Sequence, residues 1–437
     1  MNEDSRPPLL EGDPASAMSR WRRRMTRMLG AIGPGVITGV ADDDPSGIAT
    51  YAQAGAQYGL NMLWTMPLAL PLMAAVQLMC ARIGRVTGKG LAANIREHFP
   101  RPVLYAVVAL LLVANTLNIA ADVAAMGETA QLVTGLDRHA MTTLFVLVSL
   151  GLQIFVPYNR YVFVLKWLTL SLLAYAGVLA TVAVPWGEVA LRSLWPHFTL
   201  DGDSAAVIVG VFGTTISPYL FFWQASEEVE DMQRDGETPL RETAGTGRAQ
   251  LRRLGWDTWS GMTYSDVAAY MIILATAVTL YPAGIHQIDT AAQAASALRP
   301  LAGSGAYWLF ALGIFGVGLI GVPVLAGSGA YAMAETFGWN WGLERRLGEA
   351  RGFYAVIAAC MLAGPVLQYT PISPMRALFW SAVINGVVAV PLLVVVVLLA
   401  TRRAAMRRFV VGPVIATLGW IATAVMAAAA CAMFWPG

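Results

Sequence analysis

The chain has 437 residues, of which 57% are hydrophobic and 13% are charged, and its mean hydropathy is +0.58. About 25% of the residues of an average soluble protein are charged, so the composition excludes that class. The net charge of +2 favours no particular type of partner. The apolar runs have the length of membrane-spanning helices and lack the alternation of barrel strands. The sequence therefore predicts an all-α integral membrane protein.

Eleven transmembrane helices are predicted, and the first and the sixth contain breaks. Their approximate ranges are 30–58, 62–83, 103–134, 141–157, 161–185, 205–231, 261–281, 304–332, 353–369, 375–400 and 410–434. Ten of them form a transporter core of two repeats, about 29–185 and 205–400, and residues 401–437 hold the eleventh helix. The polar residues 1–28 are expected to form a disordered cytoplasmic segment.

The distribution of basic residues fixes the predicted topology. If the N-terminus is cytoplasmic, 25 of the 29 Lys and Arg residues fall on the inner side of the membrane. Cytoplasmic loops carry such an excess of positive charge. We therefore expect a multi-pass protein of the cell's inner (plasma) membrane, with its N-terminus in the cytoplasm and its C-terminus outside.

The first predicted helix is interrupted by the sequence ADDDPSGIAT at 41–50. A carboxylate inside a membrane is costly unless it is paired or hydrated, so Asp44 is a functional candidate. Pro45 lacks an amide hydrogen and frees backbone carbonyls, which must find partners within the protein. Asp42 and Asp43 are expected to line the approach or to pair elsewhere. Either of them becomes the true ligand if the helix unwinds earlier.

The sixth predicted helix is interrupted by GTTISPYLFF at 213–222. Two broken helices at matching places in two halves predict an inverted-repeat transporter with its binding site at the breaks. The two breaks offer only oxygen ligands, which suit hard cations such as Mg²⁺, Ca²⁺ and Mn²⁺. The candidate ligands are the Asp44 and Asp43 carboxylates, carbonyls near Ala41 and Gly213, and the Thr214, Thr215 and Ser217 hydroxyls.

Further polar residues lie in other predicted helices. Asn115, Asn118, Asp122 and Thr129 share one face of the third helix, where they could form interhelical hydrogen bonds or line an ion or proton route. Asp266 could face the cavity or pair with an arginine at the helix end. Asn385 could face the site or pack. The candidates for an ion or proton route are Asp122, Asp266, Tyr219, Gln224 and Asn385.

Several classes of function find no support in the sequence. It has no phosphate-binding loop with a lysine and no nucleophile–histidine pair, which argues against an enzyme and against a nucleotide partner. Cys80, Cys360 and Cys431 lie scattered in apolar runs and are expected to pack rather than to bind metal or to pair. We expect a monomeric secondary transporter or channel without a cofactor or a nucleic-acid partner.

Three segments resemble the NRAMP family of divalent metal transporters, and the resemblance extends over nearly the whole chain from Gly33. They are GPGVITGVADDDPSGIATYAQAGAQYG in the first helix, GTTISPYLFFWQ in the sixth and LFALGIFGVGLIGVPVLAGSGAYAMAE in the eighth. The resemblance implies a LeuT-like inverted repeat of five plus five helices. It also implies, as usual in the family, proton-coupled uptake of Mn²⁺ or Fe²⁺.

The resemblance identifies some site residues and shows departures at others. Asp44 matches the metal-binding Asp of the family's Asp-Pro-Gly-Asn motif, whereas Gly47 replaces its Asn ligand. Asp122 matches an acidic residue of the proton route in the third helix, but Ala125 replaces the Glu that follows it.

In the sixth helix, Ser217 replaces the family's Met ligand, Tyr219 replaces a His, and Thr214 replaces the carbonyl-donating Ala. These departures resemble the NRAMP-related magnesium transporters, which accept a more hydrated ion and are thought not to couple to protons. The sequence thus predicts an alternating-access transporter of Mg²⁺ and Mn²⁺. Alternatives are a proton-coupled transition-metal importer, an amino-acid or other organic-solute symporter on the same fold, and a receptor that binds metal without moving it.

Overall fold

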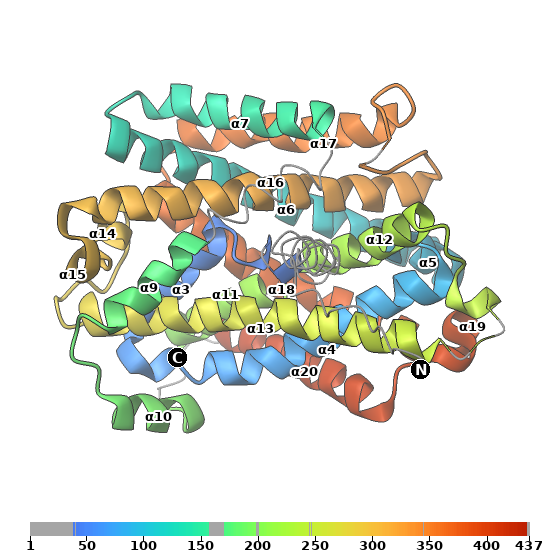
Figure 1. The fold of residues 1–437 in the computed structure, drawn as a ribbon, viewed down its shortest axis with the longest axis horizontal. Helices are drawn as coiled ribbons and strands as arrows, with labels where there is room; N and C mark the ends of the chain where they lie inside the picture. The colour runs from blue at the N-terminus through green and yellow to red at the C-terminus, as the bar shows by residue number, and fades with distance from the viewer. Residues whose placement is uncertain are drawn as a thin grey trace, which may run out of the picture. The chain divides into compact units, whose positions relative to one another are not determined.

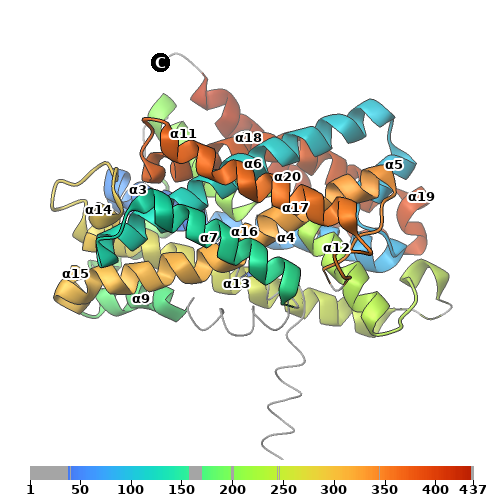
Figure 2. The same ribbon diagram turned by 90° about the horizontal axis from the view of Figure 1, so that it is seen from above.

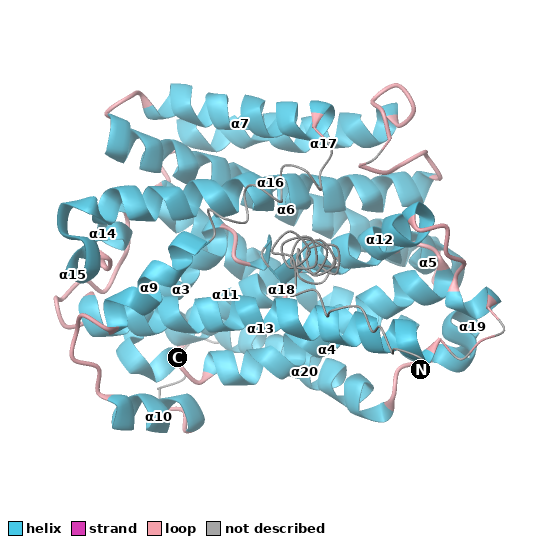
Figure 3. Cartoon of the chain, viewed as in Figure 1, coloured by secondary structure: helices cyan, strands magenta, loops and turns pink. Residues whose placement is uncertain are grey.

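The computed structural model describes residues 38–39, 41–156, 170–197, 201–243, 245, 247–343 and 345–434. The chain divides into two units, Met1–Gly33 and Pro34–Gly437, and all described residues belong to the second. Every regular element among them is a helix (Figure 3). The expected disordered segment 1–28 and most of the inner halves of the first and fifth predicted helices lie outside the described residues.

Nine spans in the described part of the chain are long and apolar enough to cross a membrane, and they match nine of the eleven predicted helices. They are α4 (Thr65–Thr87), α6 (Arg101–Thr134), α7 (Arg138–Phe155), α11 with α12 (Gly202–Thr215 and Pro218–Arg234), α13 (Arg248–Thr279), α15 with α16 (Arg299–Ala302 and Ala306–Phe337), α17 (Arg351–Ala363, with a 3-10 turn to Tyr369), α18 (Pro374–Thr401) and α20 (Pro413–Met433).

Shorter helices complete the described part. They are α3 (Pro45–Tyr58), α5 (Leu91–His98), α9 (Leu173–Leu179), α10 (Trp186–Leu194), α14 (Ala291–Ser296) and α19 (Arg403–Met406). The charged segment at 227–257 is largely helical, because α12 continues to Arg234 and α13 begins at Arg248. Its charges lie at the ends of these helices, outside the apolar stretches.

Within Pro34–Gly437 the helices form two groups on either side of the interrupted ones (Figures 1 and 2). One group contains α6, α7, α16 and α17, and the other contains α4, α13 and α20. The broken segments, α3 and α11 with α12, pack between them together with α18. This arrangement buries both predicted breaks in protein, as membrane-embedded irregular backbone requires.

Helix α11 approaches α18 closely through glycine. A Cβ atom at Gly213 would lie 2.1 Å from the carbonyl oxygen of Ala382 and 2.5 Å from the amide nitrogen of Gly386. A Cβ at Gly386 would in turn lie 2.5 Å from the carbonyl oxygen of Val209. Small residues allow membrane helices to approach this closely. The contact places the end of α11, where the second break begins, directly against α18.

We predict that Gly213→Ala lowers the thermal stability of the purified protein, because backbone atoms of α18 cannot move aside as a flexible side chain would. Gly151→Ala in α7 is the matched control, since nothing lies within 4 Å of its Cβ position and alanine favours a helix. The melting temperature in detergent is the measurement. Equal melting temperatures for the two variants would contradict close packing at Gly213.

Candidate metal site

The first break lies where α3 begins. Asp44 is the N-cap of this helix and Pro45 is its first residue, the positions that each residue type favours. The Oδ1 atom of Asp44 accepts hydrogen bonds from the Gly47 amide (2.9 Å) and the Ser46 hydroxyl (2.6 Å). Ala41 and Asp42 just before the break are helical. The break thus occurs between Asp42 and Pro45, as the sequence predicts.

The second break separates α11 from α12 at Ile216 and Ser217. The Ser217 hydroxyl lies 2.8 Å from the carbonyl oxygen of Gly213 and 2.7 Å from that of Thr214, and donates its proton to this pair. Pro218, four residues after Thr214, has no amide hydrogen, so the Thr214 carbonyl lacks its helical partner. Ser217 therefore satisfies oxygens that the sequence names as candidate ligands.

The two breaks meet in space. The Tyr219 hydroxyl on α12 donates to the carbonyl oxygen of Ala41 at 2.9 Å and lies 3.5 Å from Oδ2 of Asp44. On the other side, the Thr214 hydroxyl lies 3.1 Å from where a Cβ atom of Gly47 would be. Residues from both halves of the chain therefore surround the start of α3, as the predicted site requires.

Asn118 on α6 connects these residues to two other helices. Its Nδ2 donates to Oδ2 of Asp44 and to Oδ2 of Asp122, both at 3.0 Å. Its Oδ1 accepts a hydrogen bond from Nδ2 of Asn385 on α18 at 2.8 Å. The four side chains are buried. They form one continuous polar network from α3 through α6 to α18.

Asp44 lacks a protein counter-charge among the described residues. It is 1% exposed, and all its hydrogen-bond donors are neutral groups. The ion pairs in the described ranges involve other acids. An ionised carboxylate can accept at about four lone-pair positions; three donors lie within 3.0 Å of Asp44, and the Tyr219 hydroxyl lies at 3.5 Å. A buried acid without a cationic side chain has the electrostatics expected of a cation ligand.

Asp42 and Asp43 contact a different helix, α13. The Ser265 hydroxyl lies 2.6 Å from Oδ2 of Asp42 and 3.1 Å from Oδ1 of Asp43. The other oxygen of each carboxylate has no hydrogen-bond partner among the described residues, and the same holds for Oδ1 of the adjacent Asp266. The Ser265 hydroxyl therefore holds Asp42 and Asp43 outside the Asp44 network, and Asp266 directly follows Ser265 in α13.

Two further predicted residues do not join the Asp44 network. The Thr215 hydroxyl donates to the carbonyl oxygen of Val211 within its own helix at 2.9 Å. The side chain of Gln224 accepts from the Thr38 hydroxyl at 2.6 Å, one turn beyond Tyr219 on α12. Gln224 thus connects α12 to the residues before the first break.

Sequence reasoning left three contributors out of the candidate site. Asn118 was visible only as one of a polar stripe, although its four-residue spacing from Asp122 places both on one face. No pattern in the sequence pointed to Ser265. Gly321 in α16 approaches Asp44 so closely that an added Cβ would lie 2.9 Å from the Cβ of Asp44. That contact depends on helix packing and could not be predicted from spacing.

A cavity of about 270 Å³ lies near the site, at the ends of α3, α11 and α18 that face the predicted outside. Gln53, Gln57 and Asp203 line it, together with an ion pair between Asp289 and Arg376 (2.6 Å). It reaches Ala49, five residues or about 7 Å along α3 from Asp44.

Between this cavity and the breaks, helices α3, α11 and α18 are in contact. Side-chain atoms of Thr50, Phe379 and Val383 lie 3.2 to 3.4 Å from the Cβ position of Gly210. This apolar contact separates the cavity from the breaks.

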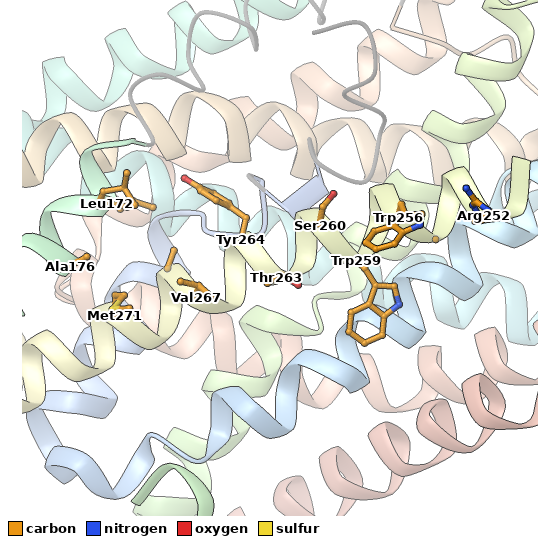
Figure 4. Close-up of a pocket in the computed structure, with 13 residues that line it drawn as sticks. Leu172, Ala176, Arg252, Trp256, Trp259, Ser260, Thr263, Tyr264, Val267 and Met271 are labelled. Atoms are coloured by element: carbon orange, nitrogen blue, oxygen red, sulfur yellow. The ribbon is translucent and has the colours of Figure 1, made fainter. Parts of the chain in front are cut away.

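A larger cavity, of about 940 Å³, lies between α9 and α13 and is not part of the site (Figure 4). Trp256, Trp259, Thr263 and Val267 line it along one face of α13, and Ala176 comes from α9. Ser265 lies on the buried face of the same helix, toward the acidic pair. Among the described residues no carboxylate lines the larger cavity, so they offer a cation no negative charge there.

Comparison with models of protein families assigns the chain to a family. The model of the natural resistance-associated macrophage protein-like family, Nramp, matches residues 35–436. The chain belongs to the NRAMP family. The predicted resemblance is thereby confirmed at the level of the family, and membership in its magnesium branch stays a prediction.

NRAMP relatives of known name are similar over most of their length. The divalent metal cation transporter MntH of Verminephrobacter eiseniae is 28% identical over 379 residues, covering 82% of each chain. MntH of Acidiphilium cryptum is 26% identical and covers 80% of this chain and 81% of its own. These relatives are named as transporters, in agreement with the prediction that the chain is not an enzyme.

Solved structures confirm the fold. A manganese transporter of Eremococcus coleocola superposes with a TM-score of 0.72 at 17% identity, covering 97% of this chain and 87% of its own. The amino-acid-bound transporter MhsT gives a TM-score of 0.58 at 13% identity, with 92% and 98% coverage. The NRAMP chain therefore has the predicted all-α LeuT-like fold of a multi-pass membrane protein.

We predict that Ser265→Ala destabilises the protein by about 1–3 kcal/mol, because the two buried carboxylates lose their hydroxyl donor. Ser149→Ala is the matched control. Ser149 is equally buried, and its hydroxyl has no hydrogen-bond partner among the described residues. The comparison is made by melting temperature. A Ser265→Ala protein as stable as the control would show that the hydroxyl does not hold the acidic pair.

Proposed function

We propose that this protein is a secondary transporter that moves Mg²⁺ and Mn²⁺ across the membrane by alternating access. The observation that carries the proposal is the buried Asp44 carboxylate between two broken helices, with neutral donors and no cationic partner in the described part of the chain. A dication supplies the positive charge that the protein does not. Its relatives are named as divalent metal cation transporters, which supports the substrate class.

The preference for hard cations follows from the ligand chemistry at the breaks. The Tyr219 hydroxyl lies beside Asp44 and Ala41, and the Ser217 hydroxyl lies beside the carbonyls of Gly213 and Thr214, so the groups that these residues present at the breaks are oxygens. Oxygen ligands suit Mg²⁺ and Mn²⁺, and Mg²⁺ retains several waters when it binds. Gly47 adds no side chain to the start of α3, which lets the Thr214 hydroxyl approach to 3.1 Å from where a Cβ atom would be. Weak, millimolar affinity is consistent with a cation that keeps its hydration shell.

The cavity lined by Gln53 and Asp203 is the proposed outer entrance. Its amide and carboxylate groups can hydrate or attract a cation, and the contact around Gly210 must open to admit it to Asp44. Movement of the repeats 29–185 and 205–400 against each other would open the two sides in turn. In this scheme the N-terminus is cytoplasmic and the C-terminus is outside, and one monomer contains the whole route.

Proton coupling is the main competing mechanism. Asp122 is fully buried and linked to Asp44 through Asn118, so a protonatable group does lie beside the site. No histidine is available there to carry the proton, since Tyr219 occupies the facing position on α12. We therefore propose uncoupled transport. Protons that move into the vesicle lumen with the metal would favour the alternative, a proton-coupled importer of Mn²⁺ or Fe²⁺.

We predict that Asp44→Ala abolishes uptake of Mn²⁺ and Mg²⁺ into proteoliposomes, and that wild-type uptake leaves the pH of the lumen unchanged. Asp137→Ala is the matched control, because Asp137 also caps a helix, α7, by accepting from the Ala140 amide at 2.9 Å. It should lose only the stability of a cap, about 1 kcal/mol. Normal uptake by Asp44→Ala, or equal loss in both variants, would refute the proposed role.

We predict that the double variant Gly47→Asn with Ser217→Met prefers Mn²⁺ over Mg²⁺, because it adds an amide and a soft thioether to the site. Each single variant serves as a control. Gly47→Asn is tight, with the Thr214 hydroxyl 3.1 Å from the new Cβ, so folding is checked by melting temperature. Competition of Mg²⁺ against Mn²⁺ uptake measures the preference, and an unchanged ratio would place the site elsewhere.

A further inference from the structure

The amide of Asn118 occupies an unusual position between two acids. Its Nδ2 lies 3.0 Å from Oδ2 of Asp44 and 3.0 Å from Oδ2 of Asp122. Both acids are buried and have no cationic partner among the described residues. Two carboxylates that converge on one neutral group repel each other when both are ionised. A positive charge between them would therefore be stabilised by both acids.

The other end of the amide faces Asn385. Oδ1 of Asn118 accepts from Nδ2 of Asn385 at 2.8 Å, while Oδ1 of Asn385 has no hydrogen-bond partner in the described ranges. Asn385 is 1% exposed, so this oxygen is buried and unsatisfied. Such an oxygen is costly unless it acquires a donor in another state of the protein.

One rearrangement gives the Asn385 oxygen a donor and frees the two acids to bind a cation. An asparagine amide has nearly the same shape after rotation by half a turn about its last side-chain bond, and this torsion is broadly two-fold. If the Asn118 and Asn385 amides both rotate, Nδ2 of Asn118 donates to Oδ1 of Asn385. One hydrogen bond between the two amides is lost and one is formed. Oδ1 of Asn118 then faces Asp44 and Asp122.

We infer that Asn118 is a cation ligand, whose amide oxygen joins Oδ2 of Asp44 and Oδ2 of Asp122 when its amide and that of Asn385 rotate. In the cation-free arrangement the two N–H groups of Asn118 hold the acceptor oxygens that a dication binds. Amide and carboxylate oxygens are ligands that hard cations prefer. Asn385 is the positioning residue that accepts the displaced N–H group. This inference rests on the proposed function and adds a ligand from α6 to the two breaks.

The rearrangement also couples binding to helix contacts. The hydrogen bond from Asn118 to Asp44 connects α6 to the start of α3, and the bond from Asn385 connects α18 to α6. When a cation binds, its coordination replaces the hydrogen bond between Asn118 and Asp44. In the bond between the two asparagines, Asn118 becomes the donor and Asn385 the acceptor. A ligand can shift a conformational equilibrium only through such a difference between states.

The test is titration of the purified full chain with Mn²⁺ and with Mg²⁺ by calorimetry. Asn118→Leu removes the amide at similar volume and should weaken binding about tenfold or more. Asn118→Asp keeps an oxygen and adds charge, so it should bind at least as tightly as wild type. Asn115→Leu is the matched control: Asn115 lies on the same helix, but its amide donates to Leu325 and Ser328 of α16. It should bind as wild type does.

The outcomes distinguish the ligand role of Asn118 from the proposed transport function. Wild-type affinity in Asn118→Leu, or equal weakening in Asn118→Asp and Asn118→Leu with unchanged melting temperatures, would overturn the ligand role while leaving the proposed function intact. Wild-type protein that binds neither ion would overturn both. An Asn118→Leu protein that melts early is replaced in the comparison by Asn385→Leu, which should weaken binding because the rotated Asn118 amide then has no acceptor.

Discussion

A buried carboxylate at a proline-interrupted helix is the constraint on which the rest of this structure depends. Pro45 prevents the preceding helix from continuing, and Asp44 caps the helix that starts there. Within a membrane the exposed carbonyls and the acid must both be satisfied inside the protein. The second break, at Ser217 and Pro218, lies beside the first. The surrounding helices exclude lipid from both.

Close helix packing makes this arrangement possible. Gly213 and Gly386 allow α11 and α18 to touch through their backbones, and Gly321 lets α16 approach Asp44. Because no side chains fill these contacts, polar groups from several helices converge on a small volume. Asn118 then bridges Asp44, Asp122 and Asn385 across three helices. Packing thus determines which polar residues become neighbours of the acid.

The acidic residues of the first break divide into two environments. Asp44 faces α6 and α12, with neutral donors around it, whereas Asp42 and Asp43 share the Ser265 hydroxyl of α13. One hydroxyl carries a single proton and cannot donate fully to two carboxylates. Asp42 and Asp43 are therefore less well satisfied than Asp44. The two environments give neighbouring residues of one motif different chemistry.

The sequence by itself determined the membrane class, the positions of nine described spans and the two breaks. These follow from local properties: hydrophobic length, proline geometry and the cost of a charge in lipid. It also identified Asp44 as a functional candidate, because an ionised acid inside a membrane helix is costly unless it is paired or hydrated. Only the tertiary structure decided that Asp42 and Asp43 face Ser265, that Thr215 bonds within its own helix, and that Asn118 links Asp44 to Asn385. These partners are separated by up to 267 positions along the chain, and the spacing within any one helix contains no information about which residue of another helix lies opposite.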